Sequence, residues 1–186
     1  MAHSLGQKQR TAVYIDGSNF YHYLKNKQIG FHKGSFFDFE EFVSYLVGGG
    51  RECVSKRYYT GIFRNIDNSD KSISLVSGQQ KFLAKLENAG FIIKRGNIMY
   101  DAGKPREKGT DVKIAVDLIV GAVDDEYDTA ILISSDTDLI PALKYIRYKN
   151  KRIEYVGFSH APSFGIQKNV DFSRLFLPEE IHKFIK

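Results

Sequence analysis

Four aspartates occupy positions at which a chain could build a site for a divalent cation. Asp16 directly follows the apolar run TAVYI, Asp136 and Asp138 follow a second apolar run and two serines, and Asp111 opens a helical pattern. Carboxylates packed together repel unless a cation neutralises them. Hard oxygen ligands without a paired histidine or a cysteine cluster favour Mg²⁺ or Mn²⁺ over zinc. Such ions orient a phosphodiester, activate a water and stabilise the leaving oxygen.

Three of these acids also have a purely structural explanation. Asp16 could form an Asx-turn, Asp138 could cap a helix that starts at Leu139, and Asp111 could complement a helix macrodipole. The coincidence favours a site, because acids follow both of the apolar runs expected to be central strands. Asn19 lies close behind the first acid and would fix a carboxylate, a water or a phosphate.

The elements that must position these acids alternate between strand and helix. Apolar and β-branched runs predict strands at residues 11–15, 54–63, 91–94, 129–134 and 152–158. Helical periodicity and capping residues predict helices at residues 18–25, 38–47, 79–89, 111–123, 139–149 and 178–185. The polar residues 64–72 and the basic residues 95–109 are expected to be connections.

This alternation predicts an α/β fold, a three-layer α/β/α sandwich with a mainly parallel sheet of about five strands. Ligands of such sheets bind at the carboxyl ends of the strands, where the strand order reverses. If strands 11–15 and 129–134 are neighbours there, Asp16, Asp136 and Asp138 converge. Asp111 joins them only if its helix begins at the same edge, which the sequence leaves open.

Length and composition fit one domain of ordinary size. The 186 residues divide into a flexible segment, 1–10, and a single expected domain, 11–186. The single cysteine, Cys53, excludes an internal disulfide framework and a cysteine-based zinc site, and a cytoplasmic location is expected. No signal peptide or membrane-spanning run is found. The net charge of +5 gives the protein a mild electrostatic preference for polyanions.

A nucleic-acid surface is one interpretation of the residues around the acids. Lys104, Arg106 and Lys108 precede Asp111 and could follow a phosphate backbone, although a solvated loop explains them equally well. Tyr21 could stack on a splayed base, although core packing accounts for most aromatic residues. Residues 48–50, GGG, lack the spacing of a dinucleotide or phosphate-binding loop.

Three blocks together resemble the signature of NYN domains, and in particular of the LabA-like bacterial branch of the PIN-like nuclease superfamily. They are IDGSNF (15–20), KGTDVKIAVDLI (108–119) and SSDTDLIPAL (134–143). The resemblance implies a PIN-like fold and a ribonuclease that depends on Mg²⁺ or Mn²⁺. By position, Asp16, Asp111, Asp136 and Asp138 match the metal-binding and catalytic acids, and Asn19 matches the asparagine of the first block.

The resemblance also assigns secondary positions. Asp117 matches a further family acid, and Ser134 and Ser135 stand beside the third block's aspartates. Ser135 occupies a position where the family usually has glycine, so that SSDTD replaces SGDxD. A Cβ there restricts the backbone beside the site but leaves the acids in place.

Two hypotheses from different classes follow. The first is a metal-dependent ribonuclease that hydrolyses single-stranded or structured RNA with a metal-activated water. The second is an RNA-binding regulatory adaptor with the same fold and weak or no catalysis. A dehalogenase-type phosphatase is disfavoured because Ser18 replaces the acid required two residues after the nucleophile. A homodimer is possible through an exposed edge at strand 152–158.

Overall fold

A seven-stranded sheet forms the middle layer of the protein, in the order β4-β3-β2-β1-β5-β6-β7. The computed structural model describes residues 8–32, 34–65, 67–101 and 104–186, without the side chains of 100, 101 and 104–106. The strands are β1 (Gln9–Asp16), β2 (Arg51–Ile62), β3 (Ile92–Asp101), β4 (Lys104–Lys108), β5 (Thr129–Ile133), β6 (Arg152–Phe158) and β7 (Phe172–Phe176). All neighbours pair in parallel except β3 and β4.

The strand β1 lies at the centre and is covered on both faces. Val13 and Ile15 pack into one hydrophobic cluster, whereas Ala12 and Tyr14 pack into the other. Successive side chains of a strand point to opposite faces, so a continuous apolar run fills both layers. This burial confirms the prediction of a central strand at 11–15.

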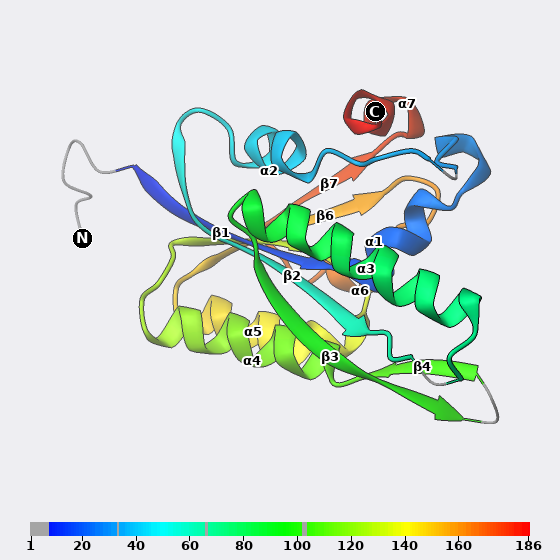
Figure 1. Ribbon diagram of the computed structural model, residues 1–186. Coiled ribbons are helices and arrows are strands. Elements are labelled where there is room, and N and C mark those ends of the chain that lie inside the picture. Colours follow the sequence, from blue (N-terminus) through cyan, green and yellow to red (C-terminus); the bar gives the residue numbers. More distant parts are fainter. Residues whose placement is uncertain (1–7, 33, 66, 102–103) are drawn as a thin grey trace.

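Helices cover both faces of the sheet and complete a three-layer sandwich (Figure 1). One layer contains α1 (Gly17–Leu24), α2 (Phe39–Val47), α3 (Asp70–Asn88) and α7 (Pro178–Ile181), all of which contribute to the first hydrophobic cluster. The other layer contains α4 (Thr110–Val123), α5 (Ile140–Tyr148) and α6 (Phe164–Gln167). Short 3₁₀ helices lie at Lys27–Ile29, Thr137–Leu139 and His182–Phe184. The predicted α/β/α class is confirmed.

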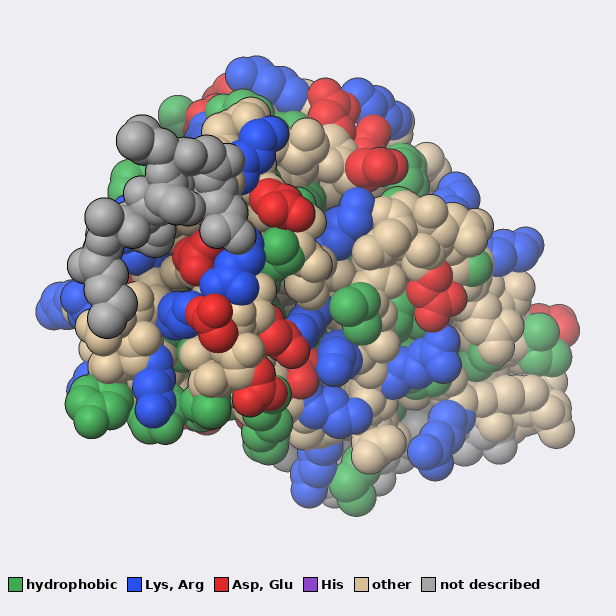
Figure 2. Space-filling model, turned by 90° about the vertical axis from the view of Figure 1, so that its left-hand side faces the viewer, with side chains coloured by type: hydrophobic (Ala, Val, Ile, Leu, Met, Phe, Trp, Pro, Cys, Tyr) green, Lys and Arg blue, Asp and Glu red, His purple; other side chains and the backbone are tan. Residues whose placement is uncertain are grey.

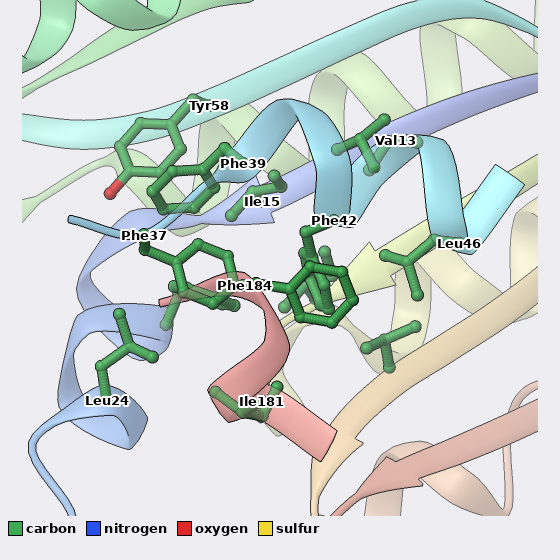
Figure 3. Close-up of a cluster of buried hydrophobic side chains, with 14 of the residues drawn as sticks. Val13, Ile15, Leu24, Phe37, Phe39, Phe42, Leu46, Tyr58, Ile181 and Phe184 are labelled. Atoms are coloured by element: carbon green, nitrogen blue, oxygen red, sulfur yellow. The ribbon is translucent and has the colours of Figure 1, made fainter. Parts of the chain in front are cut away.

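The first cluster is rich in phenylalanine. Phe37, Phe39 and Phe42 surround Phe20, with ring centroids 4.9, 5.1 and 5.7 Å away. Figure 3 shows Phe37 and Phe39 beside Tyr58, with Phe42 and Phe184 further along. Edge-to-face and tilted ring contacts of this kind add to the stabilisation from burial itself. The packing fixes α1 and α2 against the sheet, and α1 carries the residues that follow Asp16.

The structure contains elements that the sequence pattern did not reveal. The helix α3 starts at Asp70, inside the stretch expected to be a loop, and Ser69 caps it by accepting a hydrogen bond from the Ser72 amide (3.2 Å). Residues 70–78 include three serines and a glycine, and Ile73 and Leu75 are exposed. This half of the helix therefore has no apolar periodicity, which the prediction required.

The expected sheet of about five strands was too small by two. The strand β4 (KPREK) falls in the segment expected to be a basic connection, and it is a charged strand at the edge of the sheet. The strand β7 pairs with β6 from Glu154–Phe172 to Phe158–Phe176. The expected exposed edge at 152–158, which would have permitted a homodimer, is therefore covered by β7.

The expected N-terminal segment, 1–10, falls partly outside the described residues, since the described chain begins at residue 8 and β1 at Gln9. No helix in the described ranges is long and apolar enough to cross a membrane.

Candidate functional site

The acids converge at the carboxyl ends of two neighbouring strands. Strands β1 and β5 pair in parallel up to Ile15 and Ile133, which places Asp16 beside Ser134. The strand order reverses at this pair, because β2 follows on one side and β6 on the other. The predicted switch point therefore exists, and it is where open parallel sheets bind ligands.

Three carboxylates meet at this edge. Asp111, Asp136 and Asp138 each offer an oxygen within 4.8 Å of the others. Asp111 lies in the first turn of α4, so this helix does begin at the site edge, the point that the sequence left open. Gly109 precedes this helix with φ +80°, a left-handed conformation that glycine adopts without steric cost.

The three acids fit a hard divalent cation. Within the described part of the chain, no hydrogen bond or ion pair reaches the carboxylates of Asp111 and Asp138. Among the described residues, the carboxylate of Asp136 accepts a hydrogen bond only from the Asp138 amide, at 2.9 Å. Three adjacent carboxylates without a cation repel each other, and oxygen donors suit Mg²⁺ or Mn²⁺. The donor set and its unsatisfied charge therefore fit the divalent cation that the sequence resemblance implies.

Asp136 also serves as a helix cap. It occupies the N-cap of the 3₁₀ helix Thr137–Leu139, and Leu139 occupies the N-cap position of α5. The alternative explanation of Asp138 as the cap of the following helix was therefore wrong. The exposed carboxylate of Asp138 therefore does not cap α5.

Asp16 lies beside the three acids as a buried and hydrogen-bonded carboxylate. It is 8% exposed and accepts the Asn19 amide at 3.1 Å, the Asn19 side chain at 3.1 Å and the Ser134 hydroxyl at 2.9 Å. Burial raises the pKa of Asp16, against the opposing effect of these hydrogen bonds, and the nearby Glu107 carboxylate raises it further. Asp16 is also the N-cap of α1, so the Asx-type role and a place at the site coexist.

The serines of the third block hold the site together. Ser134 is fully buried and accepts the Asp136 amide at 3.2 Å. Ser135 donates its hydroxyl to the side-chain oxygen of Asn19 at 2.6 Å. Ser135 is not among the described non-glycine residues with a positive φ angle. A serine in place of the usual glycine therefore causes no backbone strain at this position. Its hydroxyl orients the asparagine that holds Asp16.

Asp117 lies away from the three-acid group. It accepts a hydrogen bond from the Tyr59 hydroxyl at 2.8 Å and pairs with Lys94 at 3.0 Å and with Arg57 at 3.8 Å. The structure therefore places this predicted secondary residue in an ion-pair group between α4 and strands β2 and β3.

Glu107 is a site neighbour that sequence reasoning missed. Its carboxylate accepts hydrogen bonds from Ser18 and Thr110, the residues two positions after Asp16 and one before Asp111. The only signal was its proximity to the KGTD block, because a glutamate in a basic stretch resembles a surface residue. Ser163 was also missed, and its hydroxyl donates to the Ser135 carbonyl at 3.1 Å from the C-terminal part of the chain.

Of the predicted RNA-contacting residues, Lys108 is exposed beside Glu107, and the side chains of Lys104 and Arg106 lie outside the described residues. Tyr21 is 51% exposed on α1, and its ring lies under the Lys25 ammonium at 4.5 Å. The exposed ring agrees with an interaction surface on α1.

The opposite edge of the sheet is a less promising site. Figure 2 shows the side from which β1 starts, where basic and acidic side chains lie beside one another. A hollow of about 690 Å³ there is lined by Arg10, Asp125, Asp128 and Lys151. Arg10 pairs with both acids, and Lys151 contacts both as well. Arg10 and Lys151 are therefore already paired with acids, and the remaining positive charge of the hollow comes from Lys8 and Arg152. The charges of this lining are mixed, and none of its residues belongs to the group of three acids.

The comparison with protein families decides what kind of chain this is. The model of the NYN domain matches residues 10–174, which include every residue of the acid site. The chain belongs to the NYN domain family. This family is part of the PIN-like nuclease superfamily, whose NYN members act on RNA and typically use divalent metals.

A solved structure has the same fold. A protein of unknown function, VPA0982 from Vibrio parahaemolyticus RIMD 2210633, matches with a TM-score of 0.68 and 24% identity. The match covers 94% of this chain and 96% of that one. A search of curated proteins found no match. The structural likeness supports the fold, and the family supports the nuclease class.

Proposed function

We propose that this NYN domain is a ribonuclease that hydrolyses RNA phosphodiester bonds with Mg²⁺ or Mn²⁺. The observation that carries the proposal is the meeting of Asp111, Asp136 and Asp138 within 4.8 Å at the switch point of the sheet. Loss of ligands is the simplest route to an inactive adaptor, and this chain retains them. The three blocks also support a place in the LabA-like branch.

In this proposal Asp111, Asp136 and Asp138 hold the ion. When bound, Mg²⁺ or Mn²⁺ would neutralise these acids, orient the phosphodiester and activate an attacking water. The remaining residues position the acids. The Ser134 hydroxyl donates to Asp16 and accepts the backbone amide of Asp136. The Asn19 side chain donates to Asp16 and accepts from Ser135. These bonds fix the ends of β1 and β5 relative to each other, which sets the separation of the acids.

Asp16 has a distinct role in this arrangement. Its carboxylate is turned to Asn19 and Ser134 and lies outside the group of three. It adds negative charge behind the ion-binding acids and holds α1 at the site through the Asn19 amide. We therefore propose Asp16 and Asn19 as positioning residues, with Asp16 able to approach the ion only if these bonds rearrange.

Cleavage of a mixed pool of labelled RNAs tests the proposal. Purified protein is incubated with Mg²⁺, Mn²⁺ or EDTA, alongside an Asp136→Asn, Asp138→Asn double variant whose folding is checked by circular dichroism. The expected result is cutting that requires the metal and is at least a hundredfold slower in the variant, with 5′-phosphate ends on the products. Glu52→Gln, at an exposed acid on β2, is the control and should cut like the wild type.

Two outcomes would contradict this proposal. Cutting by the folded double variant at the wild-type rate would show that Asp136 and Asp138 are not needed for the reaction. RNA binding without any cutting by the folded wild type would instead identify an RNA-binding adaptor.

A further inference from the structure

An aromatic pocket opens beside the acid site, in the layer of helices that contains α1 and α3. It has a volume of about 620 Å³, within the range of small-molecule sites. Its floor includes Phe37, Phe39 and Tyr58, which Figure 3 shows side by side. Its rim includes Tyr21 from α1 and Leu75 from the half of α3 that the sequence pattern did not predict. We call this hollow the aromatic pocket.

The aromatic pocket adjoins the acid site. Ser18 and Glu107 line it, and they are hydrogen-bonded to each other. Ser18 lies two residues after Asp16, and Glu107 also accepts the hydroxyl of Thr110, which directly precedes Asp111. A ligand that fills the aromatic pocket therefore reaches the wall that separates it from the acids.

Cations stand over the aromatic rings at the rim. The Lys25 ammonium lies 4.5 Å from the centroid of the Tyr21 ring, and the Lys85 ammonium lies 4.9 Å from that of Phe36. Both rings line the aromatic pocket and remain partly exposed, Tyr21 at 51% and Phe36 at 37%. A purely apolar ligand would gain nothing from two ammonium groups. A nucleotide offers a flat ring for the aromatic faces and a phosphate for the cations.

We propose that the aromatic pocket receives an unpaired base of the RNA strand whose phosphodiester lies at the acids. This inference rests on the proposed ribonuclease function and narrows its substrate to single-stranded RNA. A base inside a duplex is stacked and paired, so its faces are not available to the pocket. The protein thus selects strands from which one base near the cut can turn out of its stack.

Binding in EDTA tests the pocket separately from cleavage. The probe is a short fluorescein-labelled oligoribonucleotide, used single-stranded, as a duplex, and with one base at a time removed to leave an abasic sugar. Anisotropy gives the affinity of the wild type and of Tyr21→Ala, Tyr21→Phe and Tyr148→Ala. Tyr148 is the matched control, since it is 77% exposed on α5 in the opposite layer with Lys149 6.0 Å from its ring centroid.

The proposal predicts that Tyr21→Ala weakens single-strand binding roughly tenfold, while Tyr21→Phe and Tyr148→Ala change it little. Removal of one particular base should weaken wild-type binding by a similar factor and add nothing to the effect of Tyr21→Ala. The duplex should bind more weakly than the single strand.

The base site would be overturned if Tyr21→Ala bound the single strand as tightly as the wild type. It would also be overturned if no abasic position changed the affinity of the wild type, and a protein segment would then be the next occupant to test. In that case, cutting of the same oligonucleotide after addition of Mn²⁺ would still support the ribonuclease proposal. Base-dependent binding without cutting would support the base site and overturn the ribonuclease.

Discussion

At the scale of residues, the site combines a buried, hydrogen-bonded carboxylate with carboxylates that have few or no hydrogen-bond partners among the described residues. Asp16 is buried under three hydrogen bonds, whereas Asp138 is exposed and receives none among the described residues. The sequence identified these residues through their positions after apolar runs. It could not distinguish their environments, because Ser134 meets Asp16 only when β1 and β5 pair, whereas Asn19 is a local partner at the start of α1.

The unsatisfied charge predicts an unusual effect of Asp138→Asn. Removal of one carboxylate relieves repulsion among three, so the free energy of unfolding in EDTA should rise, by about 0.5 kcal/mol. The increase in melting temperature that Mn²⁺ gives the wild type should be largely lost. Thermal unfolding with and without Mn²⁺ measures both effects. A variant that is less stable in EDTA, or that keeps the full Mn²⁺ response, would contradict the role of Asp138 as a ligand.

At the scale of elements, the start of α4 has to be placed accurately because it carries Asp111. The strands β3 and β4 provide that placement, since Glu107 on β4 accepts the hydroxyl of Thr110. Gly96 on β3 lies directly beneath, where an added Cβ would overlap the Thr110 hydroxyl. Helical periodicity predicted the range of α4, but several of the apolar residues in that pattern are exposed on the helix, namely Val112, Val116, Val120 and Val123. Sequence periodicity missed β4, because a charged edge strand has no apolar alternation.

Gly96→Ala should therefore disturb the site through the start of α4. Overpacking is expected to lower the free energy of unfolding by about 2 kcal/mol and to weaken Mn²⁺ binding by displacing Asp111. Urea unfolding and calorimetric Mn²⁺ titration measure the two effects.

The matched comparison is Gly78→Ala in the interior of α3. An added Cβ there meets no heavy atom within 4 Å, and the helix should gain about 1 kcal/mol from the better propensity of alanine. Equal effects of the two substitutions would show that space around Gly96 is not the determining factor.

At the scale of the whole molecule, the two ends of the sheet have separate tasks. The carboxyl ends of the strands carry unsatisfied acids, while the other edge carries paired charges that stabilise the fold. Arg10 at the start of β1 contacts Asp128 through its backbone amide at 2.9 Å and its guanidinium at 2.8 Å, across 118 residues of sequence. The strand order could be inferred from apolar runs only at the centre. Strand β7 and the aromatic pocket depend on long-range packing that one sequence does not reveal.

The Arg10–Asp128 pair predicts how stability depends on pH. Hydrogen bonds with Arg10 hold the pKa of Asp128 in the folded protein below the usual 3.8. The pair therefore stabilises the folded state fully at pH values well above 3.8, and this stabilisation disappears as the pH falls through the lower folded pKa. Asp128→Asn should cost about 1 kcal/mol at pH 7. Urea unfolding at a series of pH values should show this difference shrinking below pH 3.8. A difference that is constant with pH would exclude the ion pair as its source.

The proposed ribonuclease requires that Asp111, Asp136 and Asp138 together hold a divalent ion. Anomalous diffraction from crystals soaked in Mn²⁺ tests this directly, because the signal locates manganese without reference to activity. A manganese peak is expected about 2 Å from a carboxylate oxygen of each of the three acids. A strong Mn²⁺ peak elsewhere, with none between these acids at a concentration that saturates binding in solution, would contradict it.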